Sequence, residues 1–173
     1  MGLPNAEKDS PNYEVIGSIL ADASIAPMPS DIASTVSHLR EVLRIRYSSV
    51  LFRLRTGAEV MQRVDFHNVG SSQQHGLIAM TVTDGTCAGE DLDPAHEGVV
   101  ILFNASNEAK SLVLPFATGM TLHPVHATSA DPRVKDATFE ESTHTFSVPP
   151  LTTAVFVKPQ SGAQGEGLPC NTR

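Results

Sequence analysis

The stretch "LREVLRIRYSSVLFRL", from Leu39 to Leu54, changes character in its middle. Its first half has the apolar spacing of an amphipathic helix. After Tyr47, at Ser48 and Ser49, it continues as a short apolar segment that is typical of extended or irregular structure. No helical pattern of similar length follows it. The stretch therefore marks the point where a helical part of the chain gives way to a different kind of structure.

The predicted helix begins upstream of this point. Ser30 is a suitable N-cap, and Asp31 is favourable at the positive end of the helix dipole. The apolar residues that follow recur at spacings of four, three and four and so share one helix face: Ile32, Val36, Leu39 and Leu43. Full burial of these four side chains would be worth roughly 6 to 12 kcal/mol. We therefore expect this face to require something to pack against.

Beyond the helix the sequence pattern predicts strands. Thr56 and Glu59 fit a capping box, which predicts a single helical turn before the strand "RVDFHN". The later apolar segments are short and are joined by turn residues, and they read "GLIAMTVTDG", "GVVILFNASNEAKSLVLP" and "THTFSVPPLTTAVFV". Short strands without intervening helices favour antiparallel pairing. The sequence predicts an antiparallel β-sandwich over residues 51–158.

The overall composition limits the domain count and the partners. A length of 173 residues allows one ordinary hydrophobic core. The net charge is −7 and no basic run is interleaved with aromatic residues, so we expect no nucleic-acid partner. No apolar run reaches the roughly 18 residues of a membrane span, so we expect no membrane partner.

Residues 159–173 are rich in Gly and polar residues and are predicted to form a disordered tail. Whether Cys87 and Cys170 pair is left open.

An acidic cluster is the first candidate site. Asp84, Glu90, Asp91 and Asp93 offer oxygen ligands of the kind that calcium prefers. Their spacing matches no EF-hand loop, and loops between strands commonly collect such residues. We interpret the cluster as a solvated acidic loop and predict no metal site and no cofactor.

Other chemistry-bearing residues also favour ordinary structural roles. His123 and His126 would point to opposite faces of a strand, so we interpret them as strand-end residues rather than metal ligands. Glu140 and Glu141 are adjacent on the chain, whereas a glycosidase needs two carboxyl groups that face each other across a cleft. Ser48 and Ser49 lie in no nucleophile motif. Cys87 lies in the acidic loop, which would raise the pKa of a thiol there. No catalytic residue is assigned.

Ordered blocks of sequence over residues 1–158 carry a family resemblance. Among them are "VLRIRYSSVLFRL" (42–54), "DPAHEGVVILFNAS" (93–106) and "VPPLTTAVFV" (148–157). They closely resemble the C-terminal region of pullulanase-type starch debranching enzymes, the limit dextrinases of the α-amylase superfamily. The resemblance rests on several blocks in order rather than on one motif.

The resemblance implies a division of the chain. Residues 1–50 would be the end of a (β/α)8 catalytic barrel, with the amphipathic helix as its last helix, and residues 51–158 would be a C-terminal β-sandwich. The family hydrolyses α-1,6 branch linkages with acidic residues on barrel loops, and none of those motifs lies in this chain. Only the loop at Asn12 and Tyr13 is expected to approach the glucan, and the family usually has Trp in place of Tyr13.

The hypothesis that follows is a noncatalytic C-terminal region, inactive alone. Its partners would be starch, pullulan or limit dextrin, contacted through the full-length enzyme, and a catalytic barrel on which the helix docks. Two alternatives stay open: a freestanding carbohydrate-binding module, and an interaction domain that uses the helix face. A binding module needs aromatic residues to stack on sugar rings, and the chain has no Trp and two Tyr.

Overall fold

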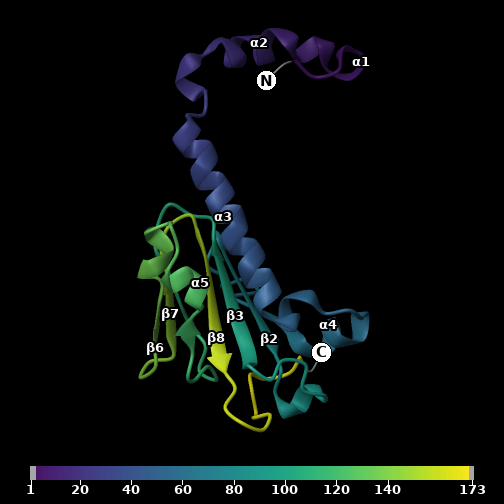
Figure 1. Ribbon diagram of the computed structural model, residues 1–173, viewed down its shortest axis with the longest axis vertical. Coiled ribbons are helices and arrows are strands. Elements are labelled where there is room, and N and C mark those ends of the chain that lie inside the picture. Colours follow the sequence, from purple (N-terminus) through teal and green to yellow (C-terminus); the bar gives the residue numbers. More distant parts are fainter. Residues whose placement is uncertain (1–2, 172–173) are drawn as a thin grey trace. The chain divides into compact units, whose positions relative to one another are not determined.

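The computed structural model describes residues 3–171 and divides after Ser37 into two compact units (Figure 1). The first unit is helical. Its short elements precede a longer helix, and they are α1 (Ala6–Asp9), η1 (Ser10–Asn12), α2 (Tyr13–Ala21) and η2 (Ala23–Ile25).

Helix α3 (Pro29–Ser48) is the predicted amphipathic helix. It begins one residue before the expected N-cap Ser30, and the carboxylate of Asp31 instead accepts a hydrogen bond from the Met28 N–H at 2.9 Å. Among the described residues 3–171, neither α3 nor any other helix is long and apolar enough to cross a membrane.

Two antiparallel sheets form the second unit, which confirms the predicted mainly β fold preceded by a helix. The larger sheet has the strand order β1-β2-β3-β8-β5, and the smaller one has the order β4-β7-β6. The strands of the larger sheet are β1 (Val64–His67), β2 (Leu77–Thr83), β3 (His96–Asn104), β8 (Thr152–Pro159) and β5 (Thr121–Leu122). Those of the smaller sheet are β4 (Lys110–Val113), β7 (Thr145–Val148) and β6 (Thr138–Glu140).

The main hydrophobic core lies between the two sheets. Phe146 of β7 and Phe156 of β8 are fully buried, and their rings meet edge to face with centroids 5.0 Å apart. Val100 and Leu102 of β3 join the same cluster. Because inward-facing residues alternate along each strand, both sheets contribute one face to a shared core, as in a β-sandwich.

The other face of the larger sheet is also apolar at one end. Val82, Val99 and Val157 lie there on three neighbouring strands and are buried. They are covered by Ile45 from α3 and by Leu51 from η3 (Val50–Arg53). Helix α3 therefore contributes to a second, smaller core outside the sandwich.

The segment between α3 and the first strand contains the predicted helix, but this helix has seven residues, about two turns, rather than the single turn expected. Helix α4 (Gly57–Arg63) has the expected capping box: the Thr56 hydroxyl accepts a hydrogen bond from the Glu59 N–H at 3.1 Å, and the Glu59 carboxylate accepts one from the Thr56 N–H at 3.0 Å. The helix ends at Arg63, and β1 follows at once.

The C-terminal segment is packed on the sandwich, which contradicts the predicted disordered tail over residues 159–171, since Pro159 belongs to β8. Residues 172 and 173 lie outside the described part of the chain. Leu168 is 1% exposed and belongs to the main core. Its backbone N–H and C=O both bond the Thr83 hydroxyl, at 3.0 and 2.6 Å. One well-buried leucine thus anchors a segment whose Gly-rich composition indicated disorder.

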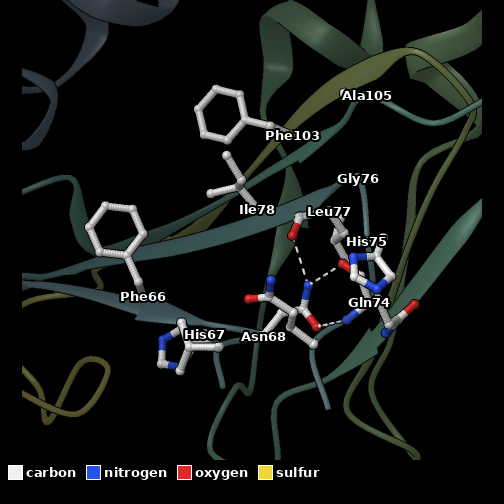
Figure 2. Close-up of a pocket in the computed structure, with 12 residues that line it drawn as sticks. Phe66, His67, Asn68, Gln74, His75, Gly76, Leu77, Ile78, Phe103 and Ala105 are labelled. Carbon is white, nitrogen blue, oxygen red and sulfur yellow. Dashed lines mark hydrogen bonds between the residues drawn. The ribbon is translucent and has the colours of Figure 1, made fainter. Parts of the chain in front are cut away.

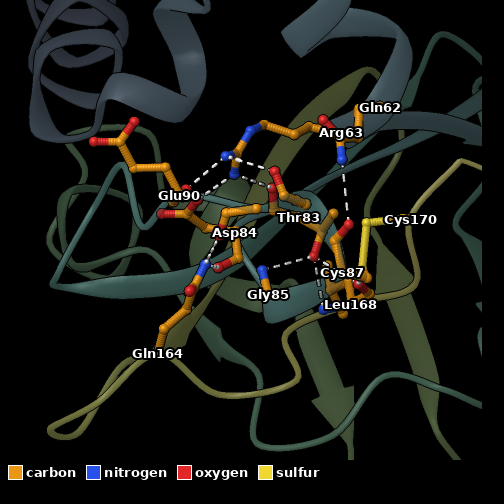
Figure 3. Close-up of a disulfide and its surroundings, with 12 residues drawn as sticks. Gln62, Arg63, Thr83, Asp84, Gly85, Cys87, Glu90, Gln164, Leu168 and Cys170 are labelled. Carbon is orange, nitrogen blue, oxygen red and sulfur yellow. Dashed lines mark hydrogen bonds and ion pairs between the residues drawn. A yellow bond between two sulfur atoms is a disulfide. The ribbon is translucent and has the colours of Figure 1, made fainter.

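A disulfide joins Cys87 to Cys170 and closes this segment onto the loop after β2 (Figure 3). Gly85 is needed there, because a Cβ at this position would collide with the backbone carbonyl of Glu166. The pairing that the sequence left open is therefore present, and Cys87 has no free thiol.

Candidate functional site

The candidate functional site is the exposed apolar face of α3. The four residues predicted to share this face are 55%, 41%, 56% and 42% exposed, and they are Ile32, Val36, Leu39 and Leu43. We call this set the outer stripe. Such continuous apolar exposure on a well-formed helix is typical of a face that packs on another protein surface.

The opposite side of α3 is buried against the sandwich. Leu39 and Leu43 each lie two residues from Glu41, which corresponds to about 200° around a helix of 3.6 residues per turn. Glu41 and Ile45 are both 6% exposed. From residue 38 onward the helix therefore has two faces: Glu41 and Ile45 pack on the sandwich, and Leu39 and Leu43 lie on the far side.

A buried carboxylate holds the inner face of α3. Glu41 accepts hydrogen bonds from the Ser129 hydroxyl at 2.5 Å and from the Ala130 N–H at 2.8 Å. Burial opposes the charge on this carboxyl, but the two hydrogen bonds and the nearby Arg44 outweigh it and hold the pKa of Glu41 below its ordinary value. A charged Glu41 with both hydrogen bonds therefore holds the inner face of α3 against the sandwich, with Leu39 and Leu43 on the far side.

Arginines are concentrated in the second half of α3 and in the segment that follows it, and we call this set the arginine rim. Five of the twelve basic residues of the chain lie between residues 40 and 55, and they are Arg40, Arg44, Arg46, Arg53 and Arg55. The guanidinium of Arg53 lies over the ring of Tyr47, 5.1 Å from its centroid, which is a cation–π contact on the same side as the outer stripe. An apolar stripe with a cationic rim on an otherwise acidic chain favours a partner surface that carries carboxylates.

The two predicted strand-end histidines differ in where they lie. His123 directly follows β5 (Thr121–Leu122), so the interpretation as a strand-end residue holds for it, and it also caps the short helix α5 (Pro124–Ala127), because Pro124 favours a helical start directly after a cap. His126 lies inside α5, so the same interpretation is wrong for it. Both rings are buried, and their centroids lie 6.4 Å apart.

Hydrogen bonds fix the protonation of His123. Its Nδ1 accepts the Val125 N–H at 3.1 Å, so the ring hydrogen is on Nε2, which donates to the Ser48 hydroxyl at 3.0 Å. Ser48 in turn donates to the Ile45 carbonyl at 2.8 Å. Ser48 therefore has no base placed to accept its proton.

Acidification should destabilise the fold through His123. Burial, and to a smaller extent the charges of His126 and His96, lower the pKa of His123 from 6.5 to about 4. A group whose folded pKa is depressed contributes stability that is present above pH 6.5 and is lost as the pH falls toward 4, here at most about 3 kcal/mol. The urea concentration at the midpoint of unfolding should therefore decrease as the pH is lowered from 7 to 4.

The variant His123→Asn isolates this contribution. An asparagine oxygen can keep the cap on the Val125 N–H but does not titrate, so the variant should lose less stability than the parent over the same pH range. Exposed His75→Asn is the control and should keep the parent's pH profile. Equal pH slopes in the parent and in His123→Asn would contradict the assignment.

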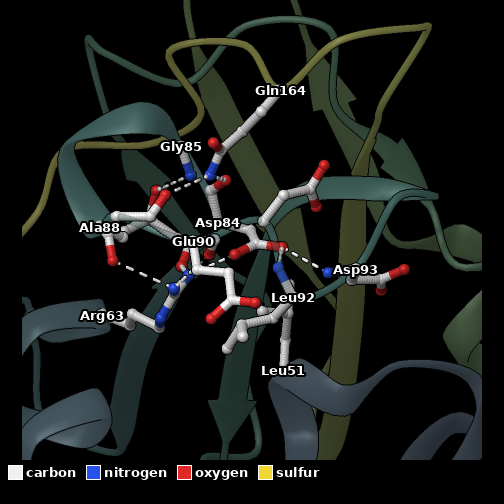
Figure 4. Close-up of polar contacts among 12 residues, drawn as sticks. Leu51, Arg63, Asp84, Gly85, Ala88, Glu90, Leu92, Asp93 and Gln164 are labelled. Carbon is white, nitrogen blue, oxygen red and sulfur yellow. Dashed lines mark hydrogen bonds and ion pairs between the residues drawn. The ribbon is translucent and has the colours of Figure 1, made fainter.

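The prediction of a solvated acidic loop is wrong in part, because two of the four carboxylates in this loop are buried. Asp84 is fully buried and Asp93 is 7% exposed, whereas Glu90 and Asp91 are exposed. Asp84 forms an ion pair with the guanidinium of Arg63, which is 3% exposed, and Figure 4 shows the two side chains meeting beneath the loop. The sequence could not reveal this, because the partner lies 21 residues upstream at the end of α4.

The Arg63–Asp84 pair organises the whole loop between β2 and β3. Arg63 also donates to the carbonyls of Ala88 and Glu90, at 3.0 and 2.6 Å. The second oxygen of Asp84 accepts the N–H groups of Leu92 and Asp93, at 2.9 and 2.6 Å. Burial raises the pKa of Asp84, and these hydrogen bonds together with Arg63 limit the rise. The carboxylate of Asp84 therefore stabilises the structure of this loop.

The proposed glucan contacts Asn12 and Tyr13 lie at the junction of η1 and α2. Asn12 is exposed, and the half-buried Tyr13 donates its hydroxyl hydrogen to the Pro4 carbonyl.

Glu140 and Glu141 are exposed neighbours on the chain. The Glu140 carboxylate accepts a hydrogen bond from the Ser142 hydroxyl, and the Glu141 carboxylate accepts one from the Gly119 N–H. This arrangement offers no pair of opposed carboxylates at that position.

Comparison with known proteins defines the class. Residues 1–159 match the family described as alpha-1,6-glucosidases, pullulanase-type, C-terminal. The chain belongs to this family and corresponds to its C-terminal region.

Individual relatives agree with this assignment. The chain is 38% identical to Pullulanase 1, chloroplastic, of Arabidopsis thaliana over 94% of its own length and 17% of that protein. It is 34% identical to Pullulanase of Klebsiella pneumoniae over 100% of its length and 16% of that protein. The chain thus spans about one sixth of the curated relatives that it matches.

Solved structures show the same fold. The crystal structure of PulA from Klebsiella oxytoca matches with a TM-score of 0.83 and 36% identity, covering 99% of this chain and 16% of that one. A maltotriose complex of PulA from Klebsiella pneumoniae matches with a TM-score of 0.81 and 33% identity, covering 97% and 18%.

Proposed function

We propose that this chain is the part of a starch-debranching α-1,6-glucosidase that completes and stabilises the catalytic barrel. In this proposal residues 1–50 form the end of the barrel, and residues 51–158 form the sandwich that braces it. The single observation that carries the proposal is the outer stripe, because it leaves four apolar side chains exposed on a helix whose other face is already packed.

The arginine rim adds a preferred partner chemistry. The five arginines between residues 40 and 55 would complement a barrel surface that carries carboxylates. The full-length enzyme would contact starch, pullulan or limit dextrin, and Asn12 and Tyr13 are the residues of this chain proposed to lie nearest that substrate.

The isolated chain should not hydrolyse pullulan. Cleavage of an α-1,6 linkage needs two carboxyl groups placed across a sugar subsite. The measurement is the release of reducing ends from pullulan by the purified chain, with a mock purification as the control. Release above the mock level would refute the noncatalytic assignment.

Polar substitution of the outer stripe should improve solubility without unfolding the sandwich. In Leu39→Ser/Leu43→Ser, the exposed side chains lose the apolar surface that drives self-association, and the buried Glu41 and Ile45 are untouched. Sedimentation velocity should show less self-association, and thermal denaturation should show a cooperative transition close to that of the parent. Loss of that transition would mean that the stripe packs on the sandwich.

The same variant tests the docking itself. Co-expressed with the preceding part of a family pullulanase that lacks this region, the parent chain should co-purify with it, and Leu39→Ser/Leu43→Ser should not. Val113→Ser is the matched control, since Val113 is 54% exposed on β4 of the smaller sheet. Retention of the complex by the double variant would contradict docking through the outer stripe.

A further inference from the structure

A hollow of about 450 Å³ lies at one end of the larger sheet, where β1, β2 and β3 meet the loop 68–76 (Figure 2). Its size falls within the range of small-ligand sites in proteins. It is separate from the outer stripe and from the Arg63–Asp84 loop.

The floor of the hollow is formed by three apolar side chains on one face of the sheet. Ile78 of β2 pairs directly with Phe103 of β3, and Phe66 of β1 pairs with Met80, two residues along from Ile78. Residues two apart on a strand share a face, so Phe66, Ile78 and Phe103 form a diagonal row, as Figure 2 shows. The two phenyl rings belong to strands about 10 Å apart, because neighbouring strands are separated by about 4.8 Å.

This row is the uncovered end of the face that α3 and η3 cover elsewhere. Val82 and Val99 lie on the same face and are buried beneath Ile45 and Leu51. Phe66, Ile78 and Phe103 are instead 47%, 56% and 39% exposed. Two aromatic rings with open faces are thus held in place by the rigid sheet.

The rim of the hollow is polar and uncharged. Asn68 adopts a positive φ of 58°, and its side chain bonds the backbone of Gln74 and Leu77, which fixes the course of the loop. The side chains of Gln73 and His75 are exposed at the rim and have no hydrogen-bond partner among residues 3–171. No Asp, Glu, Lys or Arg lines the hollow.

We propose that this hollow binds a short segment of a neutral α-glucan. The negative faces of Phe66 and Phe103 attract the weakly positive C–H groups of sugar rings, and the amide of Gln73 and the imidazole of His75 supply donors and acceptors for hydroxyl groups. The spacing of the rings suits an oligosaccharide rather than one sugar. The uncharged rim separates this site from the arginine-rimmed outer stripe, whose chemistry suits a protein surface.

The inference rests on the proposed function only for the choice of glucan, and its test needs no catalytic barrel. Affinity electrophoresis of the purified chain in gels containing pullulan, with maltotriose as a competitor, measures weak binding directly. The parent chain should be retarded. Phe66→Ala/Phe103→Ala should bind about tenfold more weakly, the loss expected when about 1.4 kcal/mol of stacking and burial is removed.

Two further variants keep the test decisive. Gln73→Ala/His75→Ala changes only exposed loop side chains, so it should fold like the parent and still lose retardation. Val113→Ala, on the smaller sheet, should behave as the parent. If Asn12→Ala/Tyr13→Ala abolishes binding while the Phe66 and Phe103 variant does not, the glucan contacts the first unit and the proposal is overturned.

No retardation of the parent chain would also overturn it. A change in self-association without a change in glucan binding would assign Phe66 and Phe103 to a protein contact instead. The docking proposal is unaffected by either result, because it is measured by co-purification.

Discussion

Replacing Arg63 with methionine should lower the free energy of unfolding by about 3 to 5 kcal/mol. The change leaves the carboxylate of Asp84 buried without its cation, and the carbonyls of Ala88 and Glu90 lose their donor. Breaking one side of a buried ion pair has a cost of this size because the remaining charge is uncompensated. Denaturant unfolding at pH 7 measures it.

Arg133→Met is the matched control for this prediction. Arg133 is exposed, so its replacement should change the free energy of unfolding by less than about 0.5 kcal/mol. A loss below about 1 kcal/mol in Arg63→Met would show that the loop between β2 and β3 does not depend on the pair.

Removal of the disulfide should lower the free energy of unfolding by about 2 to 4 kcal/mol in Cys87→Ser/Cys170→Ser. The bond links residues 83 positions apart, and cross-linking a long loop restricts the unfolded chain strongly. The C-terminal segment should stay docked in the folded variant, because Leu168 remains in the core and bonded to Thr83.

Reduction of the parent chain separates the loss of the disulfide from other effects of the two substitutions. Dithiothreitol should destabilise the parent by about as much as the double substitution does, and it should leave the double variant unchanged. If the double variant is as stable as the parent, the other contacts of the C-terminal segment suffice to close the loop. Retained protection of the Leu168 amide from hydrogen exchange would confirm that the segment stays docked.

Local patterns in the sequence predicted the fold well. The capping box at Thr56 and Glu59 is visible because both partners lie three residues apart, and the change from helical to strand periodicity is visible in the same way. The spacing of Leu39 and Leu43 likewise defines an apolar face, which the structure shows to be exposed. These features depend on residues that are close in sequence.

The features that the sequence did not reveal depend on distant residues. Asp84 was assigned to a solvated loop because nothing near it in sequence indicated Arg63 as a partner. The C-terminal segment was assigned to disorder because its composition outweighs one leucine, although Leu168 fills a position in the core. Residues Phe66 and Phe103 lie on separate strands, so their shared hollow appears only once the strand register is known.

The two faces of α3 have a consequence for changes in length. Glu41 and Ile45 bind the sandwich, whereas Leu39 points about 200° away from Glu41. One residue inserted between Leu39 and Glu41 would rotate Ile32, Val36 and Leu39 by about 100° relative to the inner face without altering any side chain. Between Leu39 and Glu41 this helix should therefore tolerate apolar-for-apolar substitution of its exposed side chains better than the insertion or deletion of a single residue.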